Sequence, residues 1–219
     1  FRALISYAQA NGIEVSETAL QSYHKVPIFD DDSKAKTYLN EQELQALYEM
    51  KLSGMKERVR DIFMLGCYLG QRVSDYNNLT KSDFTTTRRG NRVVSFTQEK
   101  TNNAVVVPII YDNVYSIAEK YNYNFPRLSH SVINRYIKRI LADLSTTLPS
   151  LRQTLRTAIT LKEQQAEARG TMHFERDAKG YVVKPRYEMV STHTARRSCI
   201  TNLYLSNRFT ISQLMSISG

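Results

Sequence analysis

Two stretches of the chain space their apolar residues as α-helices do. Residues 56–69 are almost continuously apolar after the first turn, which is typical of a fully buried helix, and Gly70 can end it. Between residues 132 and 144 apolar side chains recur every three or four positions, and Ser129 or Ser131 can cap the helix. The pattern therefore predicts two core helices.

The sequence around residue 40 predicts the start of another helix. Asn40 is a favourable N-cap, and Glu43 stands three residues later, where it can complete a capping box. Leu39 and Leu44 are placed to pack across this cap. We therefore expect the main domain to begin near Tyr38.

The residues before this helix have a different character. Residues 1–11 predict the end of a helix closed by Asn11 and Gly12, whereas residues 22–37 combine a proline, three consecutive aspartates and alternating lysines, as linkers do. The expected division is 1–37 and 38–219. Because the chain starts at Phe1 without a signal-peptide pattern, we expect its start to be a fragment boundary.

Short β-branched runs predict strands between the helices. Residues 92–98 and 104–110 are such runs, and they predict a hairpin with Glu99 and Lys100 at its turn. A second hairpin is expected over residues 171–190, turning at 177–180.

Further helices complete the expected architecture. They cover residues 72–79, residues 148–169 as a continuation of the preceding helix, and residues 191–205 with Ser191 or Thr192 as the cap. A last short helix begins after Thr210. The sum is an α+β fold that is mainly helical, with small antiparallel sheets or hairpins.

Composition narrows the class of partner. The chain has 219 residues, of which 42% are hydrophobic, so it can bury an ordinary core. Its formal net charge of +9 favours a polyanionic partner, nucleic acid before an anionic membrane. A membrane is less favoured because no apolar stretch reaches about 18 residues and the chain has no Trp.

Cysteine use indicates neither a disulfide framework nor a metal site. The only two cysteines are Cys67, inside an apolar run, and Cys199, and neither has the Cys or His spacing of a zinc site. We therefore expect a reduced, cytoplasmic compartment and no metal or other cofactor.

The stretch STHTARRSCITNLYL, residues 191–205, concentrates basic and small polar side chains on one helix. His193 and Arg196 are three residues apart and share a face, so the arginine could bind a phosphate while the histidine transfers a proton. For an arbitrary pair at this spacing, a locally hydrogen-bonded histidine and a solvated arginine are the commoner explanation. The pair by itself is a weak signal.

Two further positions carry candidate chemistry. Arg72 follows the buried helix across a glycine, where a helix start can help it to hold an anion, although a surface ion pair with Asp75 is equally expected. Lys100, at the hairpin tip, could reach into a groove and donate a proton. An exposed lysine that protects the edge of a sheet is the ordinary alternative.

Taken in order, the motifs LGQRVSD, QEKTNNAVVVP and STHTARRS resemble the catalytic domain of tyrosine recombinases, the phage integrase family. The segments TYLNEQEL, RDIFMLGCYLGQRVSDYNNLT and YEMVSTHTARRSCITNLYLS are similar to integrases carried by mobile elements of Bacteroides-type bacteria. The resemblance covers residues 38–219, and residues 1–25 are similar to the last helix of the family's core-binding domain. It implies the tyrosine-recombinase catalytic fold.

The resemblance also implies roles for single residues. Arg72 and Arg196 match the clamp on the scissile phosphate, Lys100 the lysine that protonates the departing 5′-oxygen, and His193 the proton-transfer histidine. Asp75 matches an acidic position one turn after the first arginine, which supports the phosphate-binding residues without touching the phosphate. Such enzymes cut and rejoin DNA through a covalent 3′-phosphotyrosine without metal or ATP. The implied partner is double-stranded DNA at attachment sites, bound by a homo-tetramer of the full-length protein.

One departure from the family pattern affects activity. The family places its nucleophilic tyrosine beyond the position of Gly219, whereas Tyr204 is the only tyrosine that follows His193 here and matches no nucleophile position. We expect a catalytic domain truncated at its C-terminus, which binds DNA without cleaving it, or one whose tyrosine comes from a neighbouring subunit. Two alternatives remain: a non-catalytic DNA-binding regulator and a type IB topoisomerase. Residues 151–190 could equally line DNA or form a solvated insertion.

Overall fold

The computed structural model describes residues 10–14, 16 and 37–218. The chain divides into two compact units, Phe1–Ala35 and Lys36–Gly219. In the first unit a helical residue, Ala10, is followed by a turn at Asn11 and Gly12. Residues 1–9 and most of the expected linker lie outside the described residues, so the nature of this unit stays a prediction.

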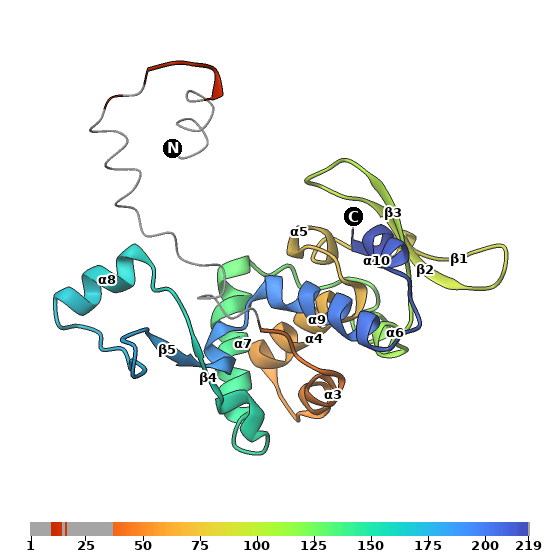
Figure 1. Cartoon of the computed structure of the whole chain (residues 1–219). Helices are drawn as coiled ribbons and strands as arrows, with labels where there is room; N and C mark the ends of the chain where they lie inside the picture. Colours follow the sequence, from red (N-terminus) through yellow and green to blue (C-terminus); the bar gives the residue numbers. More distant parts are fainter. Residues whose placement is uncertain (1–9, 15, 17–36, 219) are drawn as a thin grey trace. The chain divides into compact units, whose positions relative to one another are not determined.

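The second unit is built mainly from helices (Figure 1). Its α-helices are α3 (Glu41–Glu49), α4 (Gly54–Leu69), α5 (Val73–Tyr76), α6 (Asn113–Lys120), α7 (His130–Leu144), α8 (Leu161–Ala168), α9 (Thr192–Leu205) and α10 (Ile211–Ser218). Its 3-10 turns are η2 (Lys81–Asp83), η3 (Pro149–Arg152) and η4 (Arg186–Met189). Its strands are β1 (Phe84–Thr86), β2 (Arg92–Thr97), β3 (Ala104–Pro108), β4 (Thr154–Arg156) and β5 (Val183–Pro185). The expected mainly helical α+β class is confirmed.

Helix α4 lies at the centre of the core. From Val59 to Leu69 every residue is buried, and α3, α7 and α9 pack around it. Gly66 allows α9 and α5 to approach α4 closely, because a Cβ there would lie 3.1 Å from the Cβ of Ala195 on α9 and 2.6 Å from the ring of Tyr76 on α5. The fully buried helix predicted from the apolar run is therefore confirmed.

The predicted caps are also confirmed. Asn40 caps α3, with Glu43 completing the capping box, and Ser129 caps α7. Ser191 is the N-cap residue of α9. Each of these starts depends on side chains within one turn, which is why a local pattern was enough to place it.

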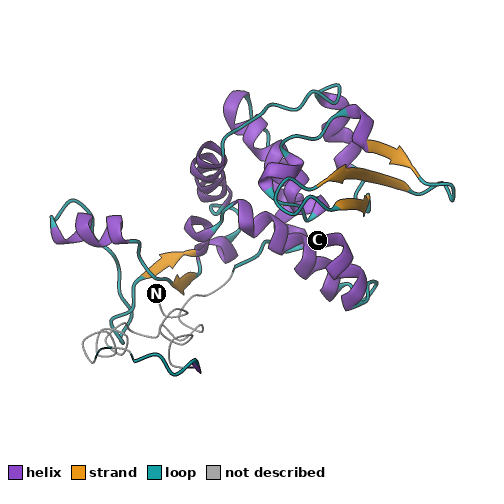
Figure 2. Cartoon of the chain, turned by 90° about the horizontal axis from the view of Figure 1, so that it is seen from above, coloured by secondary structure: helices purple, strands orange, loops and turns teal. Residues whose placement is uncertain are grey.

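Two small antiparallel sheets lie on different sides of the helices (Figure 2). The first has the order β1-β2-β3, with Val94 opposite Val107, and it contains the predicted hairpin. The pattern missed β1, which pairs with β2 through Thr85 and Val93. Its FTT sequence is too short to show an alternation of apolar and polar residues.

The predicted continuous helix over residues 148–169 is wrong. Pro149 opens the 3-10 turn η3, and β4 follows directly, pairing with β5 through Leu155 and Lys184. Thr160 then caps a separate helix, α8. The leucines of residues 148–169 have helical spacing, but they do not form one helix because Pro149 and the Thr160 cap divide the stretch.

The predicted second hairpin, residues 171–190, is only partly present. Its turn exists, since Asp177 N donates to the Tyr181 carbonyl oxygen at 2.9 Å, but a single bridge, Arg176 with Val182, follows it. Strand β5 pairs with β4 instead. The partner strand lies far away in sequence, so local alternation could not identify it.

Candidate functional site

Arg72 stands at the corner where α4 ends and α5 begins. Gly70 ends α4 with a φ of 67°, and a Cβ at this position would lie 3.1 Å from the Cys199 sulfur of α9. The corner therefore packs directly against α9. The half-buried Arg72 donates from Nη1 to Oε1 of Gln98, at the end of β2, at 3.2 Å.

Arg196 reaches the same region from α9. Its guanidinium is half-buried, and Nη2 donates to the carbonyl oxygen of Ser218 in the last turn of α10. Burial lowers the pKa of Arg196, the positive charge of Arg72 lowers it further, and the carboxylate of Asp75 opposes both. Two guanidinium groups from separate elements thus lie near enough to repel each other, and a bound anion would relieve that repulsion.

Asp75, on α5, is buried to all but 5% of its surface beside this pair. Its Oδ1 accepts a hydrogen bond from the backbone N–H of Glu99 at 3.0 Å, which fixes the β2–β3 turn to α5. Among the residues that the structure describes, its Oδ2 has no hydrogen-bond partner. The carboxylate therefore both anchors the hairpin and offsets part of the arginine charge.

Lys100 lies at the exposed tip of the β2–β3 hairpin. Gln98 holds the base of this tip, since its N–H donates to the Asn103 carbonyl oxygen and its own carbonyl accepts from Asn102 N–H, both at 2.9 Å. Within the described part of the chain, no hydrogen bond or ion pair holds the Lys100 ammonium group. The hairpin base is thus fixed beside Arg72, while the lysine side chain is left to move.

His193 is exposed near the start of α9, one turn before Arg196. Its ring lies edge-on to that of His130 on α7, with 6.2 Å between the ring centroids. Asn134 strengthens the same contact between helices, because its Oδ1 accepts from Thr192 N–H at 2.9 Å. No hydrogen bond between described residues links His193 to Arg72.

The structure therefore brings together three of the predicted positions directly and a fourth through its hairpin. The charges of Arg72 and Asp75 both act on Arg196, and the base of the Lys100 hairpin is bonded to Asp75 through its backbone and to Arg72 through Gln98. His193 shares the helix of Arg196 without joining this network. Which of these side chains act on a substrate stays a prediction.

Two buried glutamines next to the candidate site were not predicted from the sequence. Gln71 and Gln98 are both fully buried, and Gln98 Nε2 donates to Gln71 Oε1 at 3.0 Å. They flank Arg72 and Lys100 in the motifs LGQRVSD and QEKTNNAVVVP. A polar residue next to a charged one carries no local signal of burial, so only its place in the motifs could have drawn attention to it.

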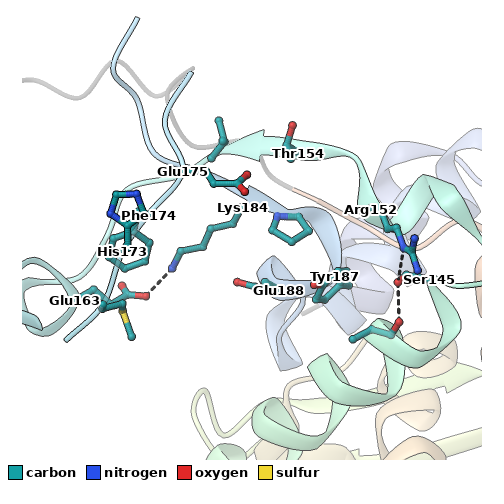
Figure 3. A pocket seen from close by; sticks show the side chains of 14 residues that line it. Ser145, Arg152, Thr154, Glu163, His173, Phe174, Glu175, Lys184, Tyr187 and Glu188 are labelled. Atoms are coloured by element: carbon teal, nitrogen blue, oxygen red, sulfur yellow. Dashed lines mark hydrogen bonds and ion pairs between the residues drawn. The ribbon is translucent and has the colours of Figure 1, made fainter. Parts of the chain in front are cut away.

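A cavity lies elsewhere, between α7 and the β4–β5 segment (Figure 3). It has a volume of about 770 Å³, and none of the predicted site residues lines it. Lys184 crosses to Glu163 at 2.6 Å, and Arg152 Nε donates to Ser145 Oγ at 3.2 Å. Burial opposes ionisation of Glu163, but hydrogen bonds from Lys184 and Thr160 outweigh it and lower its pKa to about 2. Lys184 and Glu163 therefore neutralise each other in this cavity, and Arg152 is held by a hydroxyl group.

The described part of the chain shows neither a metal-binding cluster nor an activated thiol. No group of three or more His, Cys, Asp or Glu residues there is placed to hold a metal ion. Cys67 and Cys199 are free and buried, and burial raises the pKa of the Cys199 thiol to about 12, so both thiols are poor nucleophiles. No helix among residues 10–14, 16 and 37–218 has the length and apolar character needed to cross a bilayer.

Comparison with known proteins identifies the fold. The sequence matches no protein-family model and no curated protein. The structure is similar to the Tn1549 transposon integrase in complex with circular intermediate DNA, with a TM-score of 0.56 at 12% identity, over 100% of this chain and 67% of that one. A variant of the same integrase in complex with transposon right-end DNA gives a TM-score of 0.52 at 13% identity, over 87% of this chain and 60% of that one.

A third similar structure is the XerH site-specific recombinase bound to a palindromic difH substrate. Its TM-score is 0.50 at 16% identity, over 85% of this chain. The chain spans about half of the length of XerH, 47%. At these identities the likeness establishes the fold, which is that of the tyrosine recombinase catalytic domain.

Proposed function

We propose that this chain is the catalytic part of a site-specific DNA recombinase and that Arg72 and Arg196 bind a phosphate of double-stranded DNA. The observation that carries the proposal is the meeting of these two guanidinium groups from separate elements in one half-buried place. A fold shared with DNA-bound recombinases supports it. The net charge of +9 favours the same partner.

The chemistry follows from what each group can donate. Arginine forks match phosphate oxygens in pairs, so Arg72 and Arg196 would neutralise the charge that grows on the non-bridging oxygens in the transition state. Lys100, free to move at its hairpin tip, would protonate the departing 5′-oxygen. His193 would transfer a proton at the phosphate, and Asp75 would hold the arginines and the hairpin in place.

The reaction proposed for the complete enzyme is two successive transesterifications. A tyrosine oxygen attacks phosphorus and forms the 3′-phosphotyrosine while the 5′-oxygen leaves with a proton, and a 5′-hydroxyl of a new strand then reverses these bonds. We assign the nucleophile to none of the tyrosines in this chain. Tyr204 is exposed on α9, the helix that also carries Arg196. The chain alone is therefore expected to bind DNA without cleaving it.

The finer assignments belong to the same proposal. The motifs, rather than the fold, support an integrase of a mobile element of the Bacteroides type. A homo-tetramer on paired attachment sites and a cytoplasmic location follow from that assignment. A non-catalytic DNA-binding regulator or a type IB topoisomerase would use the same phosphate clamp. A tyrosine-bearing form that relaxes plasmids without exchanging strands would favour the topoisomerase.

The test is the affinity of the chain for a DNA duplex, measured by fluorescence anisotropy at several salt concentrations. Arg72→Ala and Arg196→Ala should each weaken binding about tenfold or more, the loss of a charge-assisted phosphate contact. Arg58→Ala is the matched control, because this exposed arginine lies on α4 roughly 16 Å along the helix axis from its C-terminal end. Equal losses in all three variants, or an affinity insensitive to salt, would contradict the proposal.

A further inference from the structure

Two glutamines form a closed hydrogen-bonded pair behind the arginines. Gln71 and Gln98 are both 0% exposed, and Gln98 Nε2 donates to Gln71 Oε1 at 3.0 Å. Burying a primary amide is unfavourable unless its donors and acceptors find partners. The remaining hydrogen bonds of this pair reach groups of the candidate site, the end of α4 and α10.

Gln98 faces the site. Its Oε1 accepts two hydrogen bonds, from Arg72 Nη1 at 3.2 Å and from Thr101 Oγ1 at 2.7 Å. Thr101 directly follows Lys100 in the hairpin turn. One amide oxygen therefore positions both the guanidinium of Arg72 and the turn that carries the lysine.

Gln71 faces the end of the chain's last described helix. Its Nε2 donates to the carbonyl oxygens of Leu69, at 3.1 Å, and of Ile217, at 2.5 Å. Ile217 is in the last turn of α10, where the carbonyl of the next residue, Ser218, accepts from Arg196. The last turn of α10 is thus bonded to one arginine directly and to the other through the glutamines.

The direction of every hydrogen bond in this series, from Arg72 through the two glutamines to α10, is fixed. A guanidinium can only donate, so Gln98 must turn its oxygen toward Arg72 and its amide nitrogen toward Gln71. Gln71 must then turn its oxygen toward Gln98 and its nitrogen toward the Ile217 carbonyl. Neither amide can flip without placing two donors or two acceptors against each other, so the orientation of one amide constrains that of the other.

We propose that Gln71 and Gln98 are positioning residues that couple the docking of α10 to the arrangement of the phosphate clamp. When the last turn of α10 is in place, the relay sets Arg72 and the Lys100 turn. When α10 moves away, Gln71 loses an acceptor and the clamp loosens. The proposal rests on the function proposed above, and it makes DNA binding responsive to the docking of α10.

The experiment combines DNA affinity with hydrogen–deuterium exchange on the intact chain. Gln71→Met and Gln98→Met keep the side-chain length and remove the amide. Each should weaken duplex binding by roughly five- to tenfold, and this loss should disappear in the Arg72→Ala background. Each should also raise exchange in both residues 98–103 and residues 211–218. Asn202→Leu is the matched control, because Asn202 is a buried amide on α9 that donates to the Leu39 carbonyl at 3.0 Å.

A second variant separates the two halves of the relay and serves if Gln71→Met does not fold. Gln98→Glu keeps an acceptor for Arg72 and Thr101 but replaces the donor that faces Gln71. Exchange should then rise in residues 211–218 and stay low in residues 98–103.

Two results would overturn the relay. One is a loss of DNA affinity that is equal in the wild-type and Arg72→Ala backgrounds, or equal for Asn202→Leu. The other is an increase in exchange confined to the strand or helix that carries the substitution. If Arg72→Ala itself leaves DNA affinity unchanged, the proposed function fails, while the exchange measurements still decide whether α10 and the hairpin are coupled.

Discussion

Two guanidinium groups, those of Arg72 and Arg196, interact across one half-buried place in the structure. Burial and the positive charge of Arg72 both disfavour the charged form of Arg196, so the arrangement opposes folding rather than stabilising it. Asp75 offsets only part of the excess charge, since each side chain carries a full one. Residues held in such a costly arrangement are typical of binding and catalytic sites.

Tyr76 is a second residue whose burial is only partly compensated. Its ring fills the space left by Gly66, but its hydroxyl is buried without a hydrogen-bond partner among the described residues, and burial raises its pKa. Tyr76→Phe should therefore leave the free energy of unfolding unchanged or raise it by up to about 1 kcal/mol. Urea unfolding followed by circular dichroism measures the change.

Tyr121→Phe is the control for this prediction. The Tyr121 hydroxyl donates to Asp61 Oδ2 at 2.8 Å, so its removal should lower the free energy of unfolding by about 1 kcal/mol or more. If the two variants lose stability equally, the Tyr76 hydroxyl has a partner, such as an ordered water molecule, and the prediction is wrong.

At the scale of single residues, the sequence predicted what local chemistry determines. Asn40 and Ser129 cap their helices because the groups they bond lie within one turn. The burial of Gln71 and Gln98 could not be predicted, because it depends on strand β2, the α4–α5 corner and α10 meeting in space. The meeting of Arg72 with Arg196 came from the family resemblance, not from the pattern of either segment.

At the scale of elements, one buried ion pair joins the β5–η4 segment to α3. Arg186 donates to both carboxylate oxygens of Glu43 at 2.6 Å, and Ser150 Oγ donates to Oε1 at 2.7 Å. Burial alone would raise the pKa of Glu43, but these hydrogen bonds outweigh it and hold the pKa below its ordinary value of 4.5. The ionised carboxylate therefore stabilises the folded state above that pH.

Glu43→Gln tests this contribution through its pH dependence. At pH 7 the variant should lose about 3 kcal/mol of unfolding free energy, because Arg186 is left partly buried without its counter-charge. A group whose folded pKa is lowered loses its stabilising effect as the pH falls below 4.5, so the gap between wild type and variant should narrow there. Urea titrations at pH 7 and below pH 4.5 measure it.

The control for this pair is an exposed one. Lys56 and Asp143 are 2.6 Å apart, with side chains 41% and 54% exposed, and Asp143→Asn should change the free energy of unfolding by less than about 0.5 kcal/mol. A Glu43→Gln gap that is as small as this, or that stays constant with pH, would contradict the assigned role of the pair.

The elements differ in how much of them the sequence could predict. Helix α4 was predicted almost to the residue because its burial leaves a continuous apolar run ended by a glycine. Strand β4 was missed and β5 was given the wrong partner, because each is three residues long and the two lie almost thirty residues apart. A pairing of that kind is decided by tertiary contacts that a local pattern does not contain.

At the scale of the whole molecule, the fold was predicted from motifs rather than from the arrangement of elements. The tyrosine-recombinase catalytic fold is confirmed by the structural likeness to the Tn1549 integrase. The order of Arg72, Lys100, His193 and Arg196 along the chain carried that prediction. The particular branch of mobile elements stays a prediction, because a likeness at 12% identity is shared by distant relatives.

Residues 151–190 pose the last question at this scale, whether they line DNA or form a solvated insertion, and the segment 155–184 makes up most of them. Three of its basic side chains are engaged in ion pairs within the segment, Arg156 with Asp177, Arg176 with Glu167 and Lys184 with Glu163. Only two of its residues, Phe174 and Val182, are buried. Internal pairing of its charges favours a self-contained insertion over a DNA-binding surface.

Replacing residues 155–184 with an Asn-Gly turn tests this directly, because Thr154 and Pro185 are already paired across the β4–β5 ladder. The shortened chain should keep its melting temperature within a few degrees, and the slope of log affinity against log salt should change by less than about one unit. If the remaining basic residues, Lys162, Arg169 and Lys179, each contacted a phosphate, the slope would instead fall by about 2.7. A fall of that size with unchanged stability would assign the segment to the DNA interface, because lost counterion release reports phosphate contacts independently of folding.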